Sequence, residues 1–353
     1  MPRQPAPQQS ATLPRAIILG CAGPELSAAE REFFGRADPL GFILFARNCE
    51  TPEQVRDLVA ALRATVGRAD APVLIDQEGG RVQRLGPPHW PALPTGRAYA
   101  TLAETDFAAA TTAAKLHGRL LAADLAPLGI TVDCAPVADI LRPETHEVIG
   151  DRAYGPDPEQ VGLLAEAVCV GLLAGGVLPV IKHIPGHGRA GVDSHAELPV
   201  VETSREELNR TDFVPFRRLA AMPWAMSAHV VYTAVDGDNP ASTSTLAIRR
   251  LIRRDIGFGG ILISDDIGMQ ALQGGMAERA RACLAAGCDL TLHCSGDMAE
   301  MEDAIIGTRR LRPIAAKWLE QAERRRGDAA EKMPFDAVAA KERLDAMLAG
   351  GAD

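Results

Sequence analysis

Three histidines lie close together in the stretch KHIPGHGRAGVDSHAELP, residues 182–199: His183, His187 and His195. Pro185 and the glycines of this stretch oppose a regular helix, so the histidines are expected on a loop. Imidazoles in such a loop could bind a metal ion, transfer a proton on a mobile segment, or lie in solvent. The other polar residues of the chain help to separate these three interpretations.

A metal site would use His183 and His187 first, because their four-residue spacing is that of two ligands on a zinc-binding helix. Its further ligands would be His195 and Asp265. The spacing places two ligands on one face only in a helix, and a proline and a glycine lie between the two histidines. We therefore expect no metal and no cofactor, and a metal-dependent hydrolase remains the alternative.

Asp193 and His195 form a candidate acid/base pair. Residues two apart in an extended segment point to the same side, so the carboxylate could orient the imidazole and favour its protonated form. The competing interpretation is a turn in which the aspartate caps the backbone and the histidine is solvated. The glycines at 186, 188 and 191 predict a loop that can move, as loops that gate a reaction do.

Carboxylates and arginines occur in two further stretches. Asp265 and Asp266 follow an apolar run, where a carboxylate can act as nucleophile, base or metal ligand; Asp266 is the one expected to cap the next helix. In IDQEGGRVQRL, residues 75–85, Asp76 can accept hydrogen bonds and Arg84 can donate them. That combination suits a ligand with several hydroxyl groups, although a salt bridge within the loop would explain it equally well.

The elements that must position these residues are short apolar runs, each followed by a helix-like stretch. The runs span residues 16–20, 41–45, 73–76, 130–136, 177–183, 224–231, 260–266 and 289–295. Polar residues end several of them: Asp76, His183, His229, Asp265, Asp266 and His293. This pattern predicts an α/β fold, a closed (β/α)8 barrel of the TIM type with some irregularity, and an active site at the rim formed by the strand ends. A doubly wound open sheet is the alternative.

Helices are predicted near 27–37, 51–67, 104–125, 157–175, 204–220, 243–254, 277–287 and 299–311, and in the charged tail after residue 312. Ser27 and Thr51 are expected as N-caps, with Pro52 at the first helical position. We expect residues 15–350 to form one catalytic barrel domain and residues 1–14 to form a flexible tail.

Composition narrows the class of protein. The 353 residues carry a formal charge of -9 and are 47% hydrophobic, which allows a large core and argues against binding to nucleic acid. The seven cysteines are irregularly spaced, as expected for free thiols in a reducing compartment. The sequence shows neither a signal peptide nor an apolar run of membrane length, so we expect a cytoplasmic monomer without a membrane partner.

Four blocks resemble the signatures of family-3 glycoside hydrolases, in particular the bacterial cytoplasmic β-N-acetylglucosaminidases, or β-hexosaminidases, of peptidoglycan recycling. They are IDQEGGRVQRL (75–85), EVIGDRAYG (147–155), VIKHIPGHGRAGVDSHAELP (180–199) and ISDDIGM (263–269). The resemblance implies a retaining glycosidase that releases terminal β-1,4-linked GlcNAc from fragments such as GlcNAc-1,6-anhydro-MurNAc, with or without peptide.

The resemblance also implies a role for each matching residue. Asp265 corresponds to the nucleophile that forms a glycosyl–aspartate, His195 to the general acid/base, and Asp193 to its dyad partner. The sugar-binding positions correspond to Asp76, Arg84, Arg152, Lys182 and His183. A phosphorolytic relative and a sugar-binding module without catalysis are the remaining alternatives. The stretch Arg189-Ala190-Gly191 departs from the usual block, but the matching catalytic positions are intact.

Overall fold

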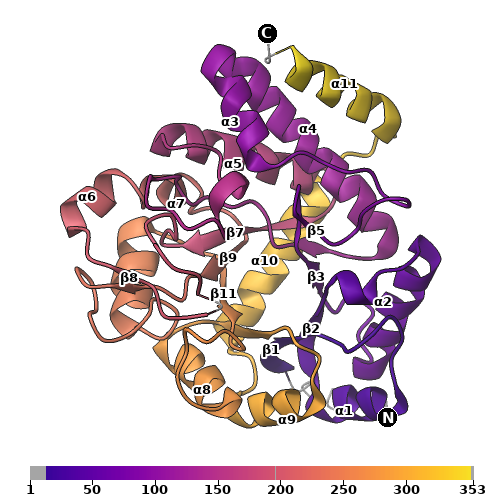
Figure 1. The fold of residues 1–353 in the computed structure, drawn as a ribbon. Coiled ribbons are helices and arrows are strands. Elements are labelled where there is room, and N and C mark those ends of the chain that lie inside the picture. The colour runs from indigo at the N-terminus through magenta and orange to yellow at the C-terminus, as the bar shows by residue number, and fades with distance from the viewer. Residues whose placement is uncertain (1–12, 195, 351–353) are drawn as a thin grey trace, which may run out of the picture.

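The computed structural model describes residues 13–194 and 196–350, and a closed barrel of eight parallel strands lies at its centre (Figure 1). Neighbouring strands follow one another in chain order, and β1 closes the ring by pairing with both β2 and β12. The barrel strands are β1 (Arg15–Leu19), β2 (Pro39–Leu44), β3 (Val73–Ile75), β6 (Val132–Asp133), β7 (Leu178–Ile184), β9 (Trp224–Ser227), β11 (Ile261–Asp266) and β12 (Leu290–His293). The predicted barrel is confirmed, and the open-sheet alternative is wrong.

Helices surround this barrel (Figure 1). They are α1 (Ala28–Ala37), α2 (Pro52–Val66), α3 (Gly96–Thr105), α4 (Phe107–Leu125), α5 (Pro158–Ala174), α6 (Arg205–Arg210), α7 (Val214–Arg218), a π-type helix (Ala247–Ile256), α8 (Met276–Ala286), α9 (Met298–Gly307), α10 (Pro313–Ala329) and α11 (Ala337–Ala349). Shorter elements are the strands β4 (Gln77–Gly79), β5 (Val82–Gln83), β8 (Val200–Val201) and β10 (Val231–Tyr232), and 3-10 turns at Ala46–Asn48, Ala126–Leu128 and Gly150–Arg152.

The helix boundaries follow local capping. Ser27 accepts a hydrogen bond from the Glu30 amide, and Thr51 caps α2 with Pro52 in its first turn, as predicted. The helix predicted near 104–125 is α4, which begins at Phe107 and is capped by the Asp106 side chain, whereas the preceding helix α3, from Gly96 to Thr105, was not predicted. One predicted helix is divided in two. The stretch 204–220 is the two short helices α6 and α7.

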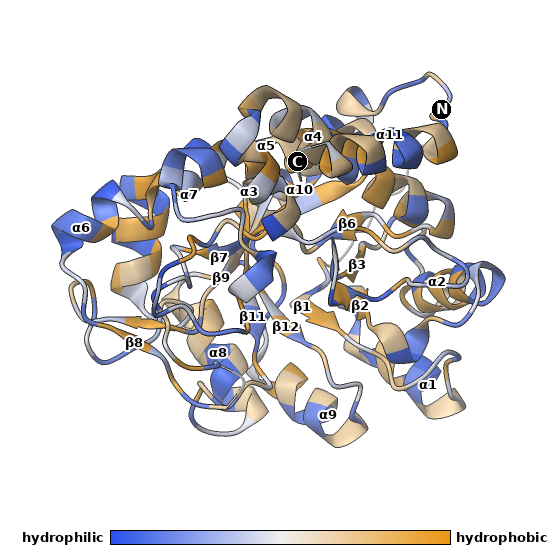
Figure 2. Ribbon diagram, turned by 45° about the horizontal axis from the view of Figure 1, so that its top comes forward, coloured by the Kyte–Doolittle hydropathy of each residue, from blue (hydrophilic) through white to orange (hydrophobic). Residues whose placement is uncertain are grey.

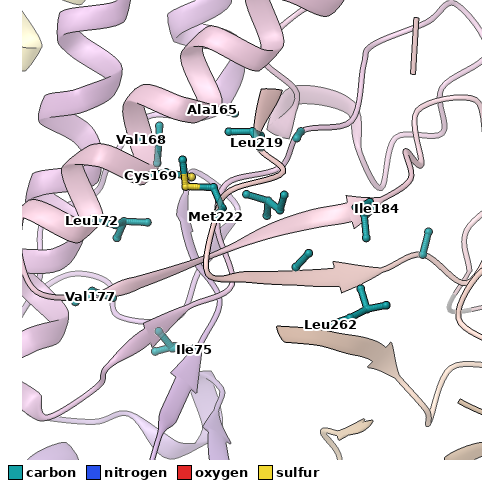
Figure 3. Close-up of a cluster of buried hydrophobic side chains, with 14 of the residues drawn as sticks. Ile75, Ala165, Val168, Cys169, Leu172, Val177, Ile184, Leu219, Met222 and Leu262 are labelled. Carbon is teal, nitrogen blue, oxygen red and sulfur yellow. The ribbon is translucent and has the colours of Figure 1, made fainter. Parts of the chain in front are cut away.

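Alternation along the strands produces two apolar layers. Ile18, Leu74 and Val180 belong to the cluster that fills the barrel, whereas their sequence neighbours Ile17 and Ile181 belong to the cluster under the helices. Figure 3 shows part of this outer cluster, and in Figure 2 strands such as β1, β2 and β6 are mainly hydrophobic in colour, whereas the helices carry both hydrophobic and hydrophilic segments. The barrel is therefore a packed support for its rim.

The C-terminal helix α10 covers the amino end of the barrel (Figure 1). Ala315 and Ala322 are buried in the cluster that fills the barrel, and Arg326 donates to the carbonyl oxygen of Gly176, at 3.1 Å, just before β7. α11 packs against α3 and α4. With its amino end covered, the barrel opens toward the carboxyl ends of its strands.

At the chain start, the amide of Leu311 donates to the carbonyl oxygen of Pro14 at 2.8 Å, and Leu13 packs against the barrel cluster. The rest of the expected tail, residues 1–12, lies outside the described residues. No helix in the described ranges is long and apolar enough to span a bilayer.

Candidate active site

A pocket of about 230 Å³ lies at the carboxyl ends of the barrel strands. It brings together six of the eight predicted site residues: Asp76, Arg84, Arg152, Lys182, His183 and Asp265. Of the other polar strand-end residues, Asp266 lines the pocket, whereas His229 and His293 are fully buried outside its lining. This is the rim at which barrel enzymes build their active sites.

One side of the pocket is a buried ion cluster centred on Lys182, on β7. Its ammonium contacts Asp76 Oδ1 at 2.9 Å and Glu78 Oε1 at 2.6 Å, and only 2% of the side chain is exposed. Arg152 donates two hydrogen bonds of 2.8 Å to the Glu78 carboxylate, from Nε to Oε2 and from Nη2 to Oε1. Arg84 completes the cluster at 3.2 Å from Asp76 Oδ2. We call these five residues the cation side of the pocket.

The charges of the cation side fix one another. Burial acts to raise the pKa of Asp76, but Lys182 and Arg84 outweigh it and hold this pKa below its usual value. Burial likewise opposes ionisation of Glu78, yet Arg152 and Lys182 hold its pKa far below the usual range. Burial acts to lower the pKa of Lys182, and the two carboxylates raise it instead. All of these groups are therefore charged at neutral pH.

His183 and His187 are arranged around a buried carboxylate, Asp139. His183 Nδ1 lies 2.7 Å from Asp139 Oδ2, and the His187 amide donates to Oδ1 at 2.6 Å. Burial acts to raise the pKa of Asp139, but its contacts with the two histidines lower it. Burial lowers the pKa of His187 to about 4, with the charge of His183 acting in the same direction, so His187 is neutral near pH 7. His187 thus shapes the pocket wall.

The opposite side of the pocket carries Asp265, at the end of β11 and 7% exposed. Its Oδ1 accepts a hydrogen bond from the amide of Asp266 at 2.8 Å, and no ion pair joins it to any cation within the described ranges. Asp266 accepts hydrogen bonds from the amides of Gly268 and Cys294, and the next helix, α8, begins at Met276 with Gly275 as its N-cap, so the helix-capping role predicted for Asp266 is wrong. We call Asp265 and Asp266 the carboxylate side of the pocket.

A buried histidine supports the carboxylate side from behind. His229 Nε2 lies 3.0 Å from the carbonyl oxygen of Asp266, and its Nδ1 lies 2.6 Å from Ser242 Oγ. Burial lowers the pKa of His229, so the ring is neutral, with Nε2–H donating to the carbonyl and Nδ1 accepting from the hydroxyl. This contact fixes the backbone at the end of β11 and with it the base of the Asp265 side chain.

The segment that carries the predicted dyad approaches the carboxylate side. Ser194 lines the pocket, and its carbonyl oxygen accepts from the Ala271 amide in the loop after β11, at 3.2 Å. Asp193 lines an open groove beside the pocket, together with Arg81 and Val148, which also line the pocket itself. His195 lies outside the described residues.

The amides of Ala196 and Glu197 both donate to the carbonyl oxygen of Asp193, at 2.9 and 3.0 Å. The extended course expected for 193–195 includes His195 and therefore lies outside the described residues. The pairing of these two residues remains a prediction.

Two glycines of the loop have a structural reason, one in its backbone conformation and one in close packing. Gly186 has φ +139°, and a Cβ on Gly188 would lie 1.9 Å from the carbonyl oxygen of Ile140. Gly191, by contrast, has no atom nearer than 3.9 Å to such a Cβ. Residues 182–188 are buried and Gly191 is exposed. The predicted loop mobility could therefore account for the glycine at 191 but not for those at 186 and 188.

Two acids that hold the site together did not stand out in the sequence, Glu78 and Asp139. Glu78 lies in the same block as Asp76, but nothing in the sequence distinguished it from an exposed glutamate on a surface loop. Asp139 follows the apolar stretch after β6, and only the fold brings it to His183. For a metal, the described part of the chain contains no cluster of three or more His, Cys, Asp or Glu side chains arranged to hold one.

Comparisons with known proteins agree with this geometry. The family model described as the glycosyl hydrolase family 3 N terminal domain matches residues 23–325. A β-hexosaminidase of Pseudomonas aeruginosa (strain LESB58) is 41% identical over 300 residues, which cover 84% of this chain and 87% of that protein. A β-hexosaminidase of Alkalilimnicola ehrlichii is 40% identical over 283 residues, covering 79% and 80%.

Among solved structures, NagZ from Neisseria gonorrhoeae in complex with N-trifluoroacetyl-D-glucosamine superimposes with a TM-score of 0.82 at 33% identity, covering 97% of this chain and 99% of that chain. A family 3 β-N-acetylglucosaminidase from Paenibacillus sp. str. FPU-7 also gives a TM-score of 0.82, at 28% identity, covering 94% of this chain and 66% of that chain.

Proposed function

From the premise that this chain belongs to glycosyl hydrolase family 3 and is a β-hexosaminidase, we propose that it removes a terminal β-1,4-linked N-acetylglucosamine from peptidoglycan fragments with retention of configuration. The substrate class is GlcNAc-1,6-anhydro-MurNAc, with or without peptide. The proposed place of action is the cytoplasm, in cell-wall recycling, with the protein acting as a monomer and without a metal or cofactor.

The observation that carries the mechanism is the contrast among the pocket carboxylates. Asp76 is bound by Lys182 and Arg84, and Asp266 accepts two backbone amides. Asp265 accepts one hydrogen bond, from the Asp266 amide, and has no ion pair among the described residues, so its lone pairs remain available. An ionised carboxylate with free lone pairs at the pocket wall is what attack on an anomeric carbon requires.

In the proposed reaction Asp265 attacks C1 of the sugar as the glycosidic bond breaks, and His195 gives its proton to the departing oxygen. A glycosyl–Asp265 ester forms. His195, now neutral, takes a proton from water, which attacks C1, releases the sugar and restores the Asp265 carboxylate. Asp193 would stabilise the imidazolium. The contact between Ser194 and the loop after β11 supports this pairing because it brings the histidine's segment to the carboxylate side.

We propose that the sugar ring binds between the cation side and His183. Asp76, Arg84, Arg152, Lys182 and His183 line the pocket with donors and acceptors suited to hydroxyl and amide groups. The similarity to NagZ, which was solved with N-trifluoroacetyl-D-glucosamine, supports an N-acylated glucosamine as the occupant.

The first test is hydrolysis of a chromogenic aryl β-GlcNAc by purified protein, with and without EDTA and with and without inorganic phosphate. We expect turnover that survives EDTA and yields the β-anomer of free GlcNAc as the first product by NMR. Turnover lost with EDTA and restored by zinc would favour the metal-dependent hydrolase. GlcNAc-1-phosphate as the product would favour phosphorolysis.

The acid role of His195 has its own test. His195→Ala should slow hydrolysis by roughly 10²–10⁴-fold for a leaving group that needs a proton, and much less for an activated aryl such as dinitrophenol. Rates would be measured over a series of aryl leaving groups of different pKa, with Ser194→Ala as the neighbouring control. An equal loss for good and poor leaving groups would exclude His195 as the acid.

A further inference from the structure

Glu78 belongs to the cation side but does not line the pocket. It lies behind Lys182 and Arg152 and is 9% exposed. We propose that Glu78 is a positioning residue that aims these two cations and cancels their surplus charge, so that the pocket accepts a neutral N-acetylated sugar and disfavours anions. The inference rests on the proposed function, because it takes Lys182 and Arg152 as groups that bind the sugar.

Glu78 determines which hydrogen-bond donors remain for a ligand. Lys182 has three N–H groups, of which one is directed to Asp76 and one to Glu78. Arg152 has five, of which two go to Glu78 and one to the carbonyl oxygen of Val148. Counting over the described partners, one donor of the lysine and two of the arginine are left. Without Glu78, Lys182 would be held by Asp76 alone and Arg152 by the Val148 carbonyl oxygen alone, so the directions of these donors would be less fixed.

Glu78 itself is held from its backbone. Its carbonyl oxygen lies 3.0 Å from His117 Nε2, and burial lowers the pKa of His117 to about 4, so the neutral ring donates this hydrogen bond. The next residue, Gly79, has φ +95°, and a Cβ there would lie 2.2 Å from the carbonyl oxygen of Pro94. On the other side, the Gln77 side chain bonds the backbone of Arg84 and Leu85. The glutamate is thus the anchored partner, and the cations adjust to it.

The charge balance gives the second consequence. Lys182, Arg152 and Arg84 carry three positive charges, and Asp76 and Glu78 carry two negative charges. Removing Glu78 would double the surplus of the cation side, where the Lys182 and Arg152 side chains are only 2% and 10% exposed. An uncompensated buried cation is costly, and a small anion that enters the pocket relieves that cost.

The test uses the full-length protein and Glu78→Gln. An amide keeps the shape but has one acceptor oxygen, and its NH2 group would face a cation's donors. Binding of N-acetylglucosamine and of inorganic phosphate is measured by calorimetry, alongside aryl β-GlcNAc kinetics. We expect GlcNAc to bind about 10- to 100-fold more weakly and KM to rise in proportion, with a smaller change in kcat, as for lost ground-state binding. Phosphate should bind and inhibit the variant at lower concentration than the wild type.

Two further variants control this result. Glu78→Asp keeps the charge but shortens the reach, so it should weaken GlcNAc binding and leave phosphate affinity at the wild-type level; it replaces the glutamine variant if thermal unfolding shows that variant to be unfolded. Glu166→Gln removes a carboxylate from the half-exposed pair with Arg218, which lies outside the pocket lining and where solvent screens the charge, and should change neither ligand's affinity.

The outcomes separate the two proposals. Wild-type turnover with unchanged GlcNAc and phosphate binding in Glu78→Gln overturns the positioning role and leaves the proposed function standing. A fall in kcat alone also overturns it. Absence of wild-type turnover, with GlcNAc binding that Glu78→Gln weakens, overturns the proposed function and supports the role of Glu78. Absence of GlcNAc binding to the wild type overturns both.

Discussion

The two sides of the pocket hold their carboxylates in different ways. On the cation side, Asp76 and Glu78 are each in contact with two positively charged side chains. On the carboxylate side, Asp265 and Asp266 are held by backbone amides. Both sides are built at strand ends of the same barrel, so the fold alone does not set the role of an aspartate; its partners do.

The difference supports the chemical roles that we propose for Asp76 and Asp265. A carboxylate whose lone pairs are directed at ammonium and guanidinium groups is stabilised as an anion and is a poor nucleophile. It can still accept a hydrogen bond from a hydroxyl group of the ligand. A carboxylate with a single amide donor keeps lone pairs for an electrophile. Asp76 therefore suits binding and Asp265 suits attack, although both follow apolar strands in the sequence.

The largest expected effect tests this division directly. Asp265→Asn should lower kcat by roughly 10⁴–10⁶-fold, the scale on which removal of a catalytic nucleophile acts, with little change in thermal stability because the residue makes few contacts. Asp76→Asn should act mainly on KM. Steady-state kinetics on an aryl β-GlcNAc and thermal unfolding of both variants make the comparison. If the two variants lost kcat equally, the assignment of roles by partners would be wrong.

The fold was open to prediction because its signal is local. All eight predicted apolar runs are barrel strands, since continuous burial on both faces leaves a run of apolar residues that is visible in sequence. Helix starts at Ser27 and Thr51 were equally visible, because capping is decided within four residues. The helix α3 was missed because it begins at Gly96, directly after a Pro-rich connection, and its N-cap Thr95 makes no side-chain capping hydrogen bond.

The site was predictable in its residues but less so in its connections. Six proposed side chains do line one pocket, yet Glu78 and Asp139, which hold several of them in place, act through partners distant in the chain. Spacing in sequence carries no information on such contacts until the barrel brings the strand ends together. The glycines show the same limit: close packing against Ile140 explains Gly188, whereas no close contact requires a glycine at position 191, where mobility stays a prediction, and the sequence does not distinguish the two cases.

A neutral buried histidine lies behind each side of the pocket, His117 behind the cation side and His229 behind the carboxylate side. Burial lowers the pKa of both. Their neutrality matters because a protonated His117 would place one more positive charge beneath Lys182 and Arg152. We therefore expect the free energy of unfolding to fall in acid, where this arrangement must be maintained against protonation of His117.

The smallest effect we predict is the pH dependence that His117 contributes to stability. Its pKa is about 4 in the folded protein and 6.5 as the ordinary value, so between these pH values the unfolded chain takes up a proton that the folded chain does not. The contribution of neutral His117 to the free energy of unfolding is complete above pH 6.5. It is lost as the pH falls toward 4, at about 1.4 kcal/mol per pH unit, or about 3 kcal/mol in all. His117→Phe should remove this slope.

At pH 7.5 the phenylalanine variant should be less stable by roughly 1–3 kcal/mol, because the Glu78 carbonyl oxygen loses its donor. Urea unfolding at pH 7.5, 6, 5 and 4.5 should show this deficit shrinking with acid until the variant equals or exceeds the wild type. The range above pH 7 is the internal control, since neither state binds the proton there and the deficit should be constant. A deficit that stayed constant down to pH 4.5 would mean that His117 has the same pKa in the folded and the unfolded chain, and would exclude that burial keeps its ring neutral in acid.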